Sequence, residues 1–133
     1  MHPLAFKVSR KYPRYHIKDL PELKGGIGGL LSSMRVTTMG AGGCAFVSRS
    51  RRILYPPMQI ECVFEMKGVS SPVSVRADLL YSFVNSKTAE EASFFGVEFI
   101  AEDRPLVAAI VRKLEELSES EPNRVALDVM KPQ

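Results

Sequence analysis

The chain of 133 residues has the length and composition of one soluble globular domain, with 45% hydrophobic and 25% charged residues. No apolar run approaches the roughly 20 residues that cross a bilayer, and the N-terminal segment lacks the features of a secretory signal. We therefore expect a cytoplasmic protein with no membrane span. Cys44 and Cys62 have no CxxC spacing and are expected to be buried thiols in a reducing compartment.

The formal charge of +3 is distributed unevenly along the chain. Residues 1–66 hold ten Lys or Arg and four Asp or Glu, whereas residues 67–133 hold eight and eleven, so the two halves carry +6 and −3. This pattern fits an anionic partner at the basic half. It equally fits a charged surface without a partner.

The N-terminal third predicts loops and a pair of strands. Residues 25–29, "GGIGG", lack the Lys-Ser/Thr of a phosphate-binding loop and are expected to form a flexible loop. The runs 34–39 and 44–48 predict two strands joined by "GAGG" (40–43). Glycines there permit a positive φ and allow a ligand to approach the backbone closely.

The middle of the chain predicts three further strands. Residues 56–66 alternate in polarity. A turn around 68–72 leads to a second strand at 72–84, and a polar loop then leads to a third at 94–100. The apolar face of the first strand comprises Met58, Ile60, Cys62, Phe64 and Met66.

Residues 104–118 form the one segment with helical periodicity. Asp103 is the expected N-cap, and Pro105 is tolerated in the first turn. The apolar stripe is expected to pack on the sheet, or else to dock a partner; it comprises Leu106, Val107, Ile110, Val111, Leu114 and Leu117.

These elements predict an all-β domain with one helix, a small β-barrel or sandwich closed by a C-terminal α-helix. The domain is expected to span 1–133, with a core at about 8–118. Residues 1–7 form an N-terminal segment, and 119–133 form a tail whose place the sequence does not fix.

Catalytic chemistry is not indicated. His2 and His16 match no metal-ligand spacing, and no nucleophile motif occurs. The adjacent pairs Glu90–Glu91 and Glu115–Glu116 point in different directions and are expected to be solvated. We expect no enzyme activity, no metal and no cofactor.

One basic segment, "RKYPR" (10–14), places Arg10 and Arg14 four positions apart around Pro13. Two guanidinium forks can hold a phosphate or a guanine edge, and the proline lowers the cost of ordering the segment. The alternative is a solvated basic flank. The spacing alone does not decide between the two.

Taken in order, three motifs resemble those of the PilZ family of bacterial cyclic di-GMP receptors: "RKYPR" (10–14), "TMGAGGCAF" (38–46) and "FFGVEFI" (94–100). The resemblance spans about residues 8–118. It implies a six-stranded antiparallel β-barrel of the split-barrel type with a C-terminal helix. It also implies that cyclic di-GMP is the ligand.

The resemblance further implies a ligand site. Arg10 and Arg14 would clamp the phosphates and guanine, and the second motif would form the floor with Thr38, Gly40 and Gly43. Thr38 stands where the family has Asp or Asn, and Gly40 stands where it has Ser, so two hydrogen bonds are weakened or lost. The arginines at 49, 51 and 52 either compensate electrostatically or form a solvated turn.

Two hypotheses follow. The protein is a cyclic di-GMP receptor that transmits binding to a protein partner, in processes such as motility or biofilm regulation. Alternatively, it is a degenerate PilZ domain that binds no nucleotide and acts through protein contacts. A nucleic-acid-binding barrel is a third interpretation, but the sequence offers no aromatic stacking platform, so we expect no DNA partner.

Overall fold

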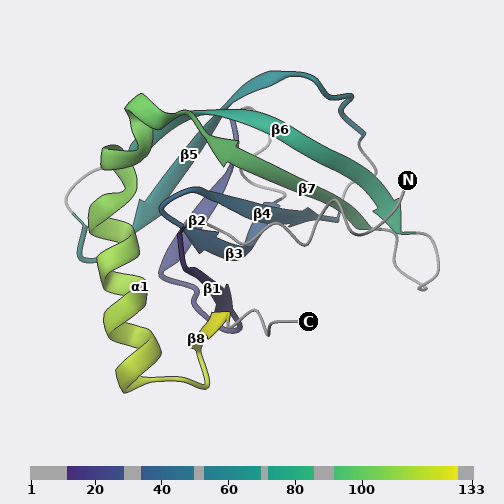
Figure 1. The fold of residues 1–133 in the computed structure, drawn as a ribbon. Helices are drawn as coiled ribbons and strands as arrows, with labels where there is room; N and C mark the ends of the chain where they lie inside the picture. The colour runs from purple at the N-terminus through teal and green to yellow at the C-terminus, as the bar shows by residue number, and fades with distance from the viewer. Residues whose placement is uncertain (1–11, 29–33, 50–52, 70–71, 86–91, 129–133) are drawn as a thin grey trace, which may run out of the picture.

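The computed structural model describes residues 12–28, 34–49, 53–69, 72–85 and 92–128. Eight strands, a 3₁₀ helix and one α-helix make up the described fold (Figure 1). In chain order they are β1 Arg14–Ile17, β2 Leu23–Ile27, β3 Met34–Gly40, β4 Gly43–Ser48, β5 Gln59–Met66, β6 Val73–Asn85, β7 Ala92–Phe99, η3 Ala101–Val107, α1 Ala108–Ser120 and β8 Val125–Asp128.

The strands form one antiparallel sheet in the order β2-β5-β6-β7-β4-β3-β1-β8. The sheet curves into a half-barrel with β2 and β8 at its edges (Figure 1). The expected β-rich fold with one C-terminal helix is confirmed. The expected closed, six-stranded barrel is wrong, because among the described residues β2 forms a strand ladder with β5 and none with β3.

The core fills the concave side of the sheet. The ring of Phe64 stacks on Phe46 at 6.0 Å and meets the edge of Phe99 at 5.9 Å between centroids. The alternation predicted for β5 holds for Cys62, Phe64 and Met66, which are buried. It fails at Met58, which precedes the strand and is exposed.

Part of the glycine-rich segment expected to be a loop is strand β2. Gly25 pairs with Phe64 of β5, and a Cβ on Gly25 would lie 2.5 Å from the Phe64 ring. The glycine therefore makes room for a core aromatic ring. Its role is packing rather than flexibility.

The helical stripe is confirmed in part. Val107, Ile110, Leu114 and Leu117 are buried, but Leu106 is exposed. The segment begins as the 3₁₀ helix η3 before α1, and α1 packs against β8 and β1.

Asp103 does not cap the helix, contrary to the sequence-based prediction. Asp103 lies inside η3, and its carboxylate accepts three hydrogen bonds from Arg76. Two come from the Arg76 guanidinium, at 2.9 and 2.8 Å, and one comes from the Arg76 backbone N–H, at 2.9 Å. These bonds lower the pKa of Asp103 to about 2. Because the Asp103 carboxylate is paired with Arg76 of β6, it does not accept a hydrogen bond from a backbone N–H at the start of the helix.

The segment left without a place in the sequence analysis contains β8, which pairs with β1 over its full length. Val125 is fully buried. Arg124 anchors the approach to β8 by donating to the carboxylates of Glu22 and Glu121 and to the carbonyl of Asp19. The edge strand is therefore fixed by apolar burial and by a three-way polar contact.

Two smaller predictions concern burial and the membrane. Cys44 and Cys62 are buried and free, as expected. Within the described ranges, neither the length nor the apolar content of any helix suffices to span a membrane.

Candidate functional site

Arg14 is the first residue of β1 and lies between two neighbouring strands. Its cross-strand partners are Gly40 of β3 and Asp128 of β8. Tyr15 and Ile17 are buried in the core. Because side chains alternate along a strand, Arg14 and His16 face the outer, convex surface of the sheet.

The β3–β4 hairpin beside Arg14 is made tight by glycines. A Cβ on Gly43 would lie 2.3 Å from the carbonyl oxygen of Val97 and 2.8 Å from Nη2 of Arg14. A Cβ on Gly40 would lie 2.1 Å from the carbonyl oxygen of Pro13. The arginine side chain therefore reaches across the hairpin, directly over bare backbone.

The hairpin glycines are required for close approach, not for unusual dihedral angles. Among the described residues, only Gly68 has a positive φ, at +92°. The positive φ that glycines permit in the "GAGG" connection is therefore not used there. The expectation of close approach to the backbone fits the contacts at Gly40 and Gly43.

An aromatic ring extends the same surface. A Cβ on Gly42 would lie 2.8 Å from the ring of Tyr12, and the guanidinium carbon of Arg104 lies 5.2 Å from the centroid of that ring. The Nε of Arg104 is buried and has no hydrogen-bond partner among the described residues. A second cation, from η3, thus stands beside the segment that carries Arg14.

Thr38 reaches this surface because of an irregularity in β3. The register of β3 against β4 shifts between Val36 and Thr38. Val36 is buried on the inner face, and the shift turns Thr38 outward, where its neighbours are His16 and Ala45. Thr38, Gly40, Gly43 and Arg14 therefore share one face.

Two carboxylates that the sequence analysis did not single out border the site. Asp128 is directly opposite Arg14, and its Oδ1 lies 3.2 Å from Nε2 of His16. Glu98 of β7 is directly opposite Gly43 and is exposed. Neither could be placed without the strand pairing, because Asp128 lies in the tail and Glu98 lies inside a motif.

Arg14 also acts electrostatically on the strand beneath it. Burial raises the pKa of the Cys44 thiol, and the adjacent Cys62 raises it further. The positive charge of Arg14 opposes this shift. The positive charge of Arg14 therefore acts on the thiol of Cys44, the second residue of β4.

The structure therefore brings together four of the five predicted site residues. Arg10 lies outside the described residues, as do Arg51 and Arg52, while Arg49 is exposed at the end of β4. Within the described ranges, no three His, Cys, Asp or Glu side chains come together in a way that could hold a metal ion.

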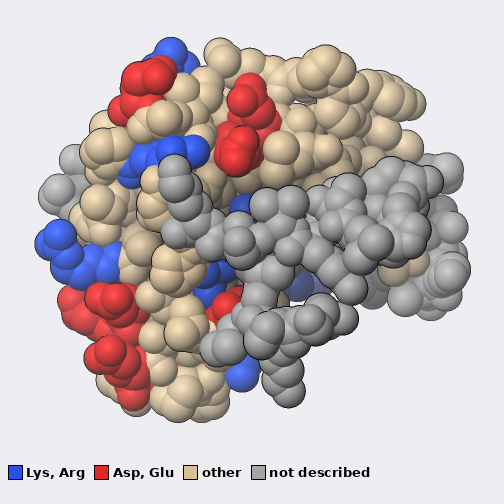
Figure 2. All heavy atoms as spheres, in the orientation of Figure 1, with Lys and Arg blue, Asp and Glu red and all other residues tan. Residues whose placement is uncertain are grey.

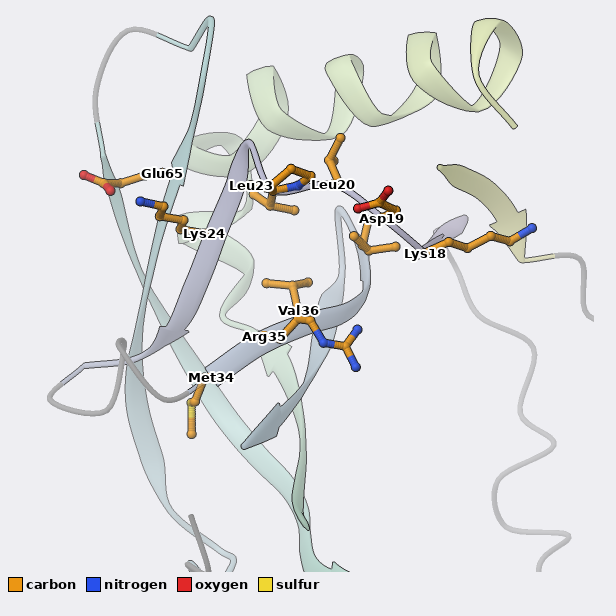
Figure 3. Close-up of a pocket in the computed structure, with 11 residues that line it drawn as sticks. Lys18, Asp19, Leu20, Leu23, Lys24, Met34, Arg35, Val36 and Glu65 are labelled. Atoms are coloured by element: carbon orange, nitrogen blue, oxygen red, sulfur yellow. The ribbon is translucent and has the colours of Figure 1, made fainter. Parts of the chain in front are cut away.

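A separate groove opens on the other side of β3, where the half-barrel is not closed between β2 and β3 (Figure 3). It has a volume of about 1090 Å³, and no residue predicted for the site lines it. The close-up shows Lys24 beside Glu65, its cross-strand partner. The lining residues are Ile17, Lys18, Asp19, Leu20, Pro21, Leu23, Lys24, Met34, Arg35, Val36 and Glu65.

The half-barrel with its C-terminal helix is a PilZ-like fold. A solved structure of Bacillus subtilis inhibitor of motility (MotI/DgrA) matches the chain with a TM-score of 0.53 and 16% sequence identity. The match covers 80% of this chain and 51% of the other, so the chain spans about half the length of that protein. At this identity the likeness concerns the fold alone. No protein-family model and no curated protein matches the sequence.

Proposed function

We propose that the chain is a PilZ-like receptor for cyclic di-GMP that transmits binding to a protein partner. The observation that carries the proposal is the position of Arg14. Its guanidinium lies over Gly43 on the same outer surface as Thr38 and Gly40, the positions of the second motif. Arg10, four residues upstream, would be the second clamp.

The residues present suit an anionic, planar ligand. The guanidinium of Arg14 can donate two hydrogen bonds to a phosphate. The bare backbone at Gly40 and Gly43 leaves space for close approach. Glu98, opposite Gly43, would supply the carboxylate acceptor for a guanine edge that Thr38 does not provide.

The test is calorimetric titration of cyclic di-GMP into the wild type, Arg14→Ala and Arg112→Ala. Arg112 is an exposed arginine of α1 and serves as the control for loss of one positive charge. Loss of a charged hydrogen-bonding group of ~1.5–3 kcal/mol predicts about 10- to 150-fold weaker binding for Arg14→Ala. Arg112→Ala should bind like the wild type. No heat with the wild type up to high micromolar ligand would refute the proposal.

A second candidate function is a degenerate PilZ-like domain that acts through protein contacts alone. Asp128 favours it, because a carboxylate directly opposite Arg14 competes with an anionic ligand for the guanidinium. This function predicts that a pull-down recovers the same partner with and without cyclic di-GMP. It also predicts that Arg10→Ala changes nothing.

The process remains part of the proposal. The solved structure with the similar fold is that of an inhibitor of motility. Motility is therefore the first phenotype to measure in cells that lack this chain or carry Arg14→Ala. An unchanged phenotype in the deletion strain would direct attention to biofilm or polysaccharide control instead.

A further inference from the structure

Exposed apolar side chains gather on one region of the molecule. Eight large apolar side chains are exposed among the described residues, and six of them lie along β6 and the segment beside it. Their exposed fractions run from 39% at Tyr81 to 74% at Tyr55. We call this group the β6 patch; it comprises Ile53, Tyr55, Met58, Leu80, Tyr81 and Phe83.

The backbone brings the two stretches together. The backbone N–H of Leu79 donates to the carbonyl of Met58 at 2.8 Å, and that of Leu54 donates to Oγ of Ser82 at 3.0 Å. The segment that contains residues 53–58 therefore runs beside β6. In Figure 2, the upper right surface shows no Lys, Arg, Asp or Glu, and an acidic cluster lies beside it at the upper centre, where β6 runs in Figure 1.

A register shift turns aromatic residues outward on this stretch. The pairing of β6 with β7 shifts between Leu79 and Tyr81. Tyr81 then lies over Gly96, and the rings of Tyr81, Phe83 and Phe94 stack with centroids 5.9 and 5.1 Å apart. Within the patch, Tyr81 and Phe83 thus form an ordered aromatic row with Phe94 on the convex face rather than scattered single residues.

The size of the patch is close to that of a small protein interface. At ~200 Å² for each large side chain, the exposed fractions give roughly 600 Å² of apolar surface. That is at the upper end of the patches found on monomers. It approaches the ~800 Å² that each partner buries in a stable interface.

Charged residues lie at opposite ends of the patch. Asp78 and Glu98 are exposed and directly opposite each other on β6 and β7, an unfavourable pairing of like charges. Arg49 is exposed at the other end, one residue beyond Ser48, which pairs with Ser93. Asp78, Glu98 and Arg49 make no ion pair with any part of the chain that the structure describes.

We propose that two copies of this chain form a two-fold symmetric dimer through the β6 patch, with the acidic end of one copy facing Arg49 of the other. A two-fold interface uses the same surface on both copies, so it must be self-complementary. Along β7, Glu98 is three residues beyond Phe95. Arg49 follows Ser48, which pairs with Ser93, so it lies beside β7 about three residues before Phe95. Each charged end is therefore ~10 Å from Phe95. A two-fold axis that lies in the interface at the level of Phe95 therefore places the acidic end of each copy against Arg49 of the other. It also places the apolar side chains of the two β6 patches against each other. Glu98 also borders the proposed nucleotide site, so the dimer is tested in the absence of nucleotide.

The test is the molar mass of the full chain by sedimentation equilibrium across the micromolar range, without nucleotide. The mass should approach that of two chains as concentration rises. Phe83→Ser should weaken dimerisation at least about 10-fold, as expected for a central aromatic contact. Leu127→Ser, which changes a side chain of matched exposure on β8 (48% against 49% for Phe83), should not.

Charge reversal tests the orientation. Asp78→Lys and Arg49→Glu should each weaken the dimer, and the double variant should recover it. Both side chains are exposed, so these variants should keep the wild-type circular dichroism spectrum. A monomer at every concentration would overturn the dimer. An equal dimer in Phe83→Ser would overturn the patch, and a double variant no stronger than the singles would overturn the two-fold arrangement.

Discussion

Placing at position 40 the serine that the PilZ resemblance implies should destabilise this protein rather than improve the proposed ligand site. In sequence terms, Gly40→Ser adds back a missing hydroxyl. In the structure, the new Cβ would lie 2.1 Å from the carbonyl oxygen of Pro13, whereas real Cβ contacts do not fall below 3.0 Å. The strand that carries Arg14 would therefore have to move by about 0.9 Å.

The cost of this movement can be worked out from the strand pairing. Gly40 is paired with Arg14, so the displacement lengthens the hydrogen bonds at the start of β1. Overpacking of this kind costs roughly 1–3 kcal/mol. At about 3–5 °C for each kcal/mol in a domain of this size, the melting temperature should fall by ~3–15 °C.

The assay is thermal unfolding followed by circular dichroism, with Gly28→Ser as the control. Gly28 is the matched substitution, because its added Cβ would meet no atom closer than 3.5 Å. That variant should melt within about 1 °C of the wild type. Equal melting temperatures for Gly40→Ser and Gly28→Ser would refute the reasoning, as would tighter cyclic di-GMP binding by Gly40→Ser.

Three further predictions follow from contacts described above. Asp128→Asn removes a carboxylate opposite Arg14 and should strengthen cyclic di-GMP binding about 3- to 10-fold by calorimetry, from ~1 kcal/mol of charge interaction. Asp103→Asn should lower the melting temperature at neutral pH, because the Arg76 hydrogen bonds hold the pKa of Asp103 at about 2. That stabilisation is complete above the ordinary pKa of 3.8 and is lost as the pH falls through 2, so the two melting temperatures should converge there. Gly96→Ala should unfold at lower urea concentration, because its Cβ would lie 2.0 Å from the ring of Tyr81, and Tyr81→Ala should relieve part of that loss.

Each of these three predictions would be contradicted by a specific result. Weaker binding by Asp128→Asn would mean that the carboxylate positions Arg14 rather than competing for it. A gap between wild type and Asp103→Asn that persists at pH 2 would show that packing, not ionisation, sets the effect. Additive losses in Gly96→Ala and Tyr81→Ala would show that the ring does not occupy the space above the glycine.

The sequence was informative where a strand is long and half-buried. The alternation through Cys62, Phe64 and Met66 located β5, and the motif at 94–100 falls on β7. The strands β1, β2 and β8 have four or five residues each, too few for a period to stand out. They form because tertiary partners are present, as when Phe64 fills the space above Gly25.

The face on which a residue lies was harder to predict than its secondary structure. A strict period of two would place Thr38 beside Val36, on the inner face, and would likewise reverse Tyr81. Register shifts in β3 and β6 turn both residues outward. The candidate site and the β6 patch therefore each depend on one local irregularity that a strict alternation pattern does not predict. Asp103 shows the same limit, since its partner Arg76 is 27 positions away.

Because β1 pairs with β8, the C-terminal strand helps to fix the position of Arg14. Every residue of β1 is matched to a residue of β8, and Arg14, His16 and Tyr15 are also matched to β3. A shift of β1 therefore changes both pairings at once. If cyclic di-GMP bound at the outer face displaced β1, it would also change the affinity of a partner bound at β8, and that partner would change the cyclic di-GMP affinity by the same factor.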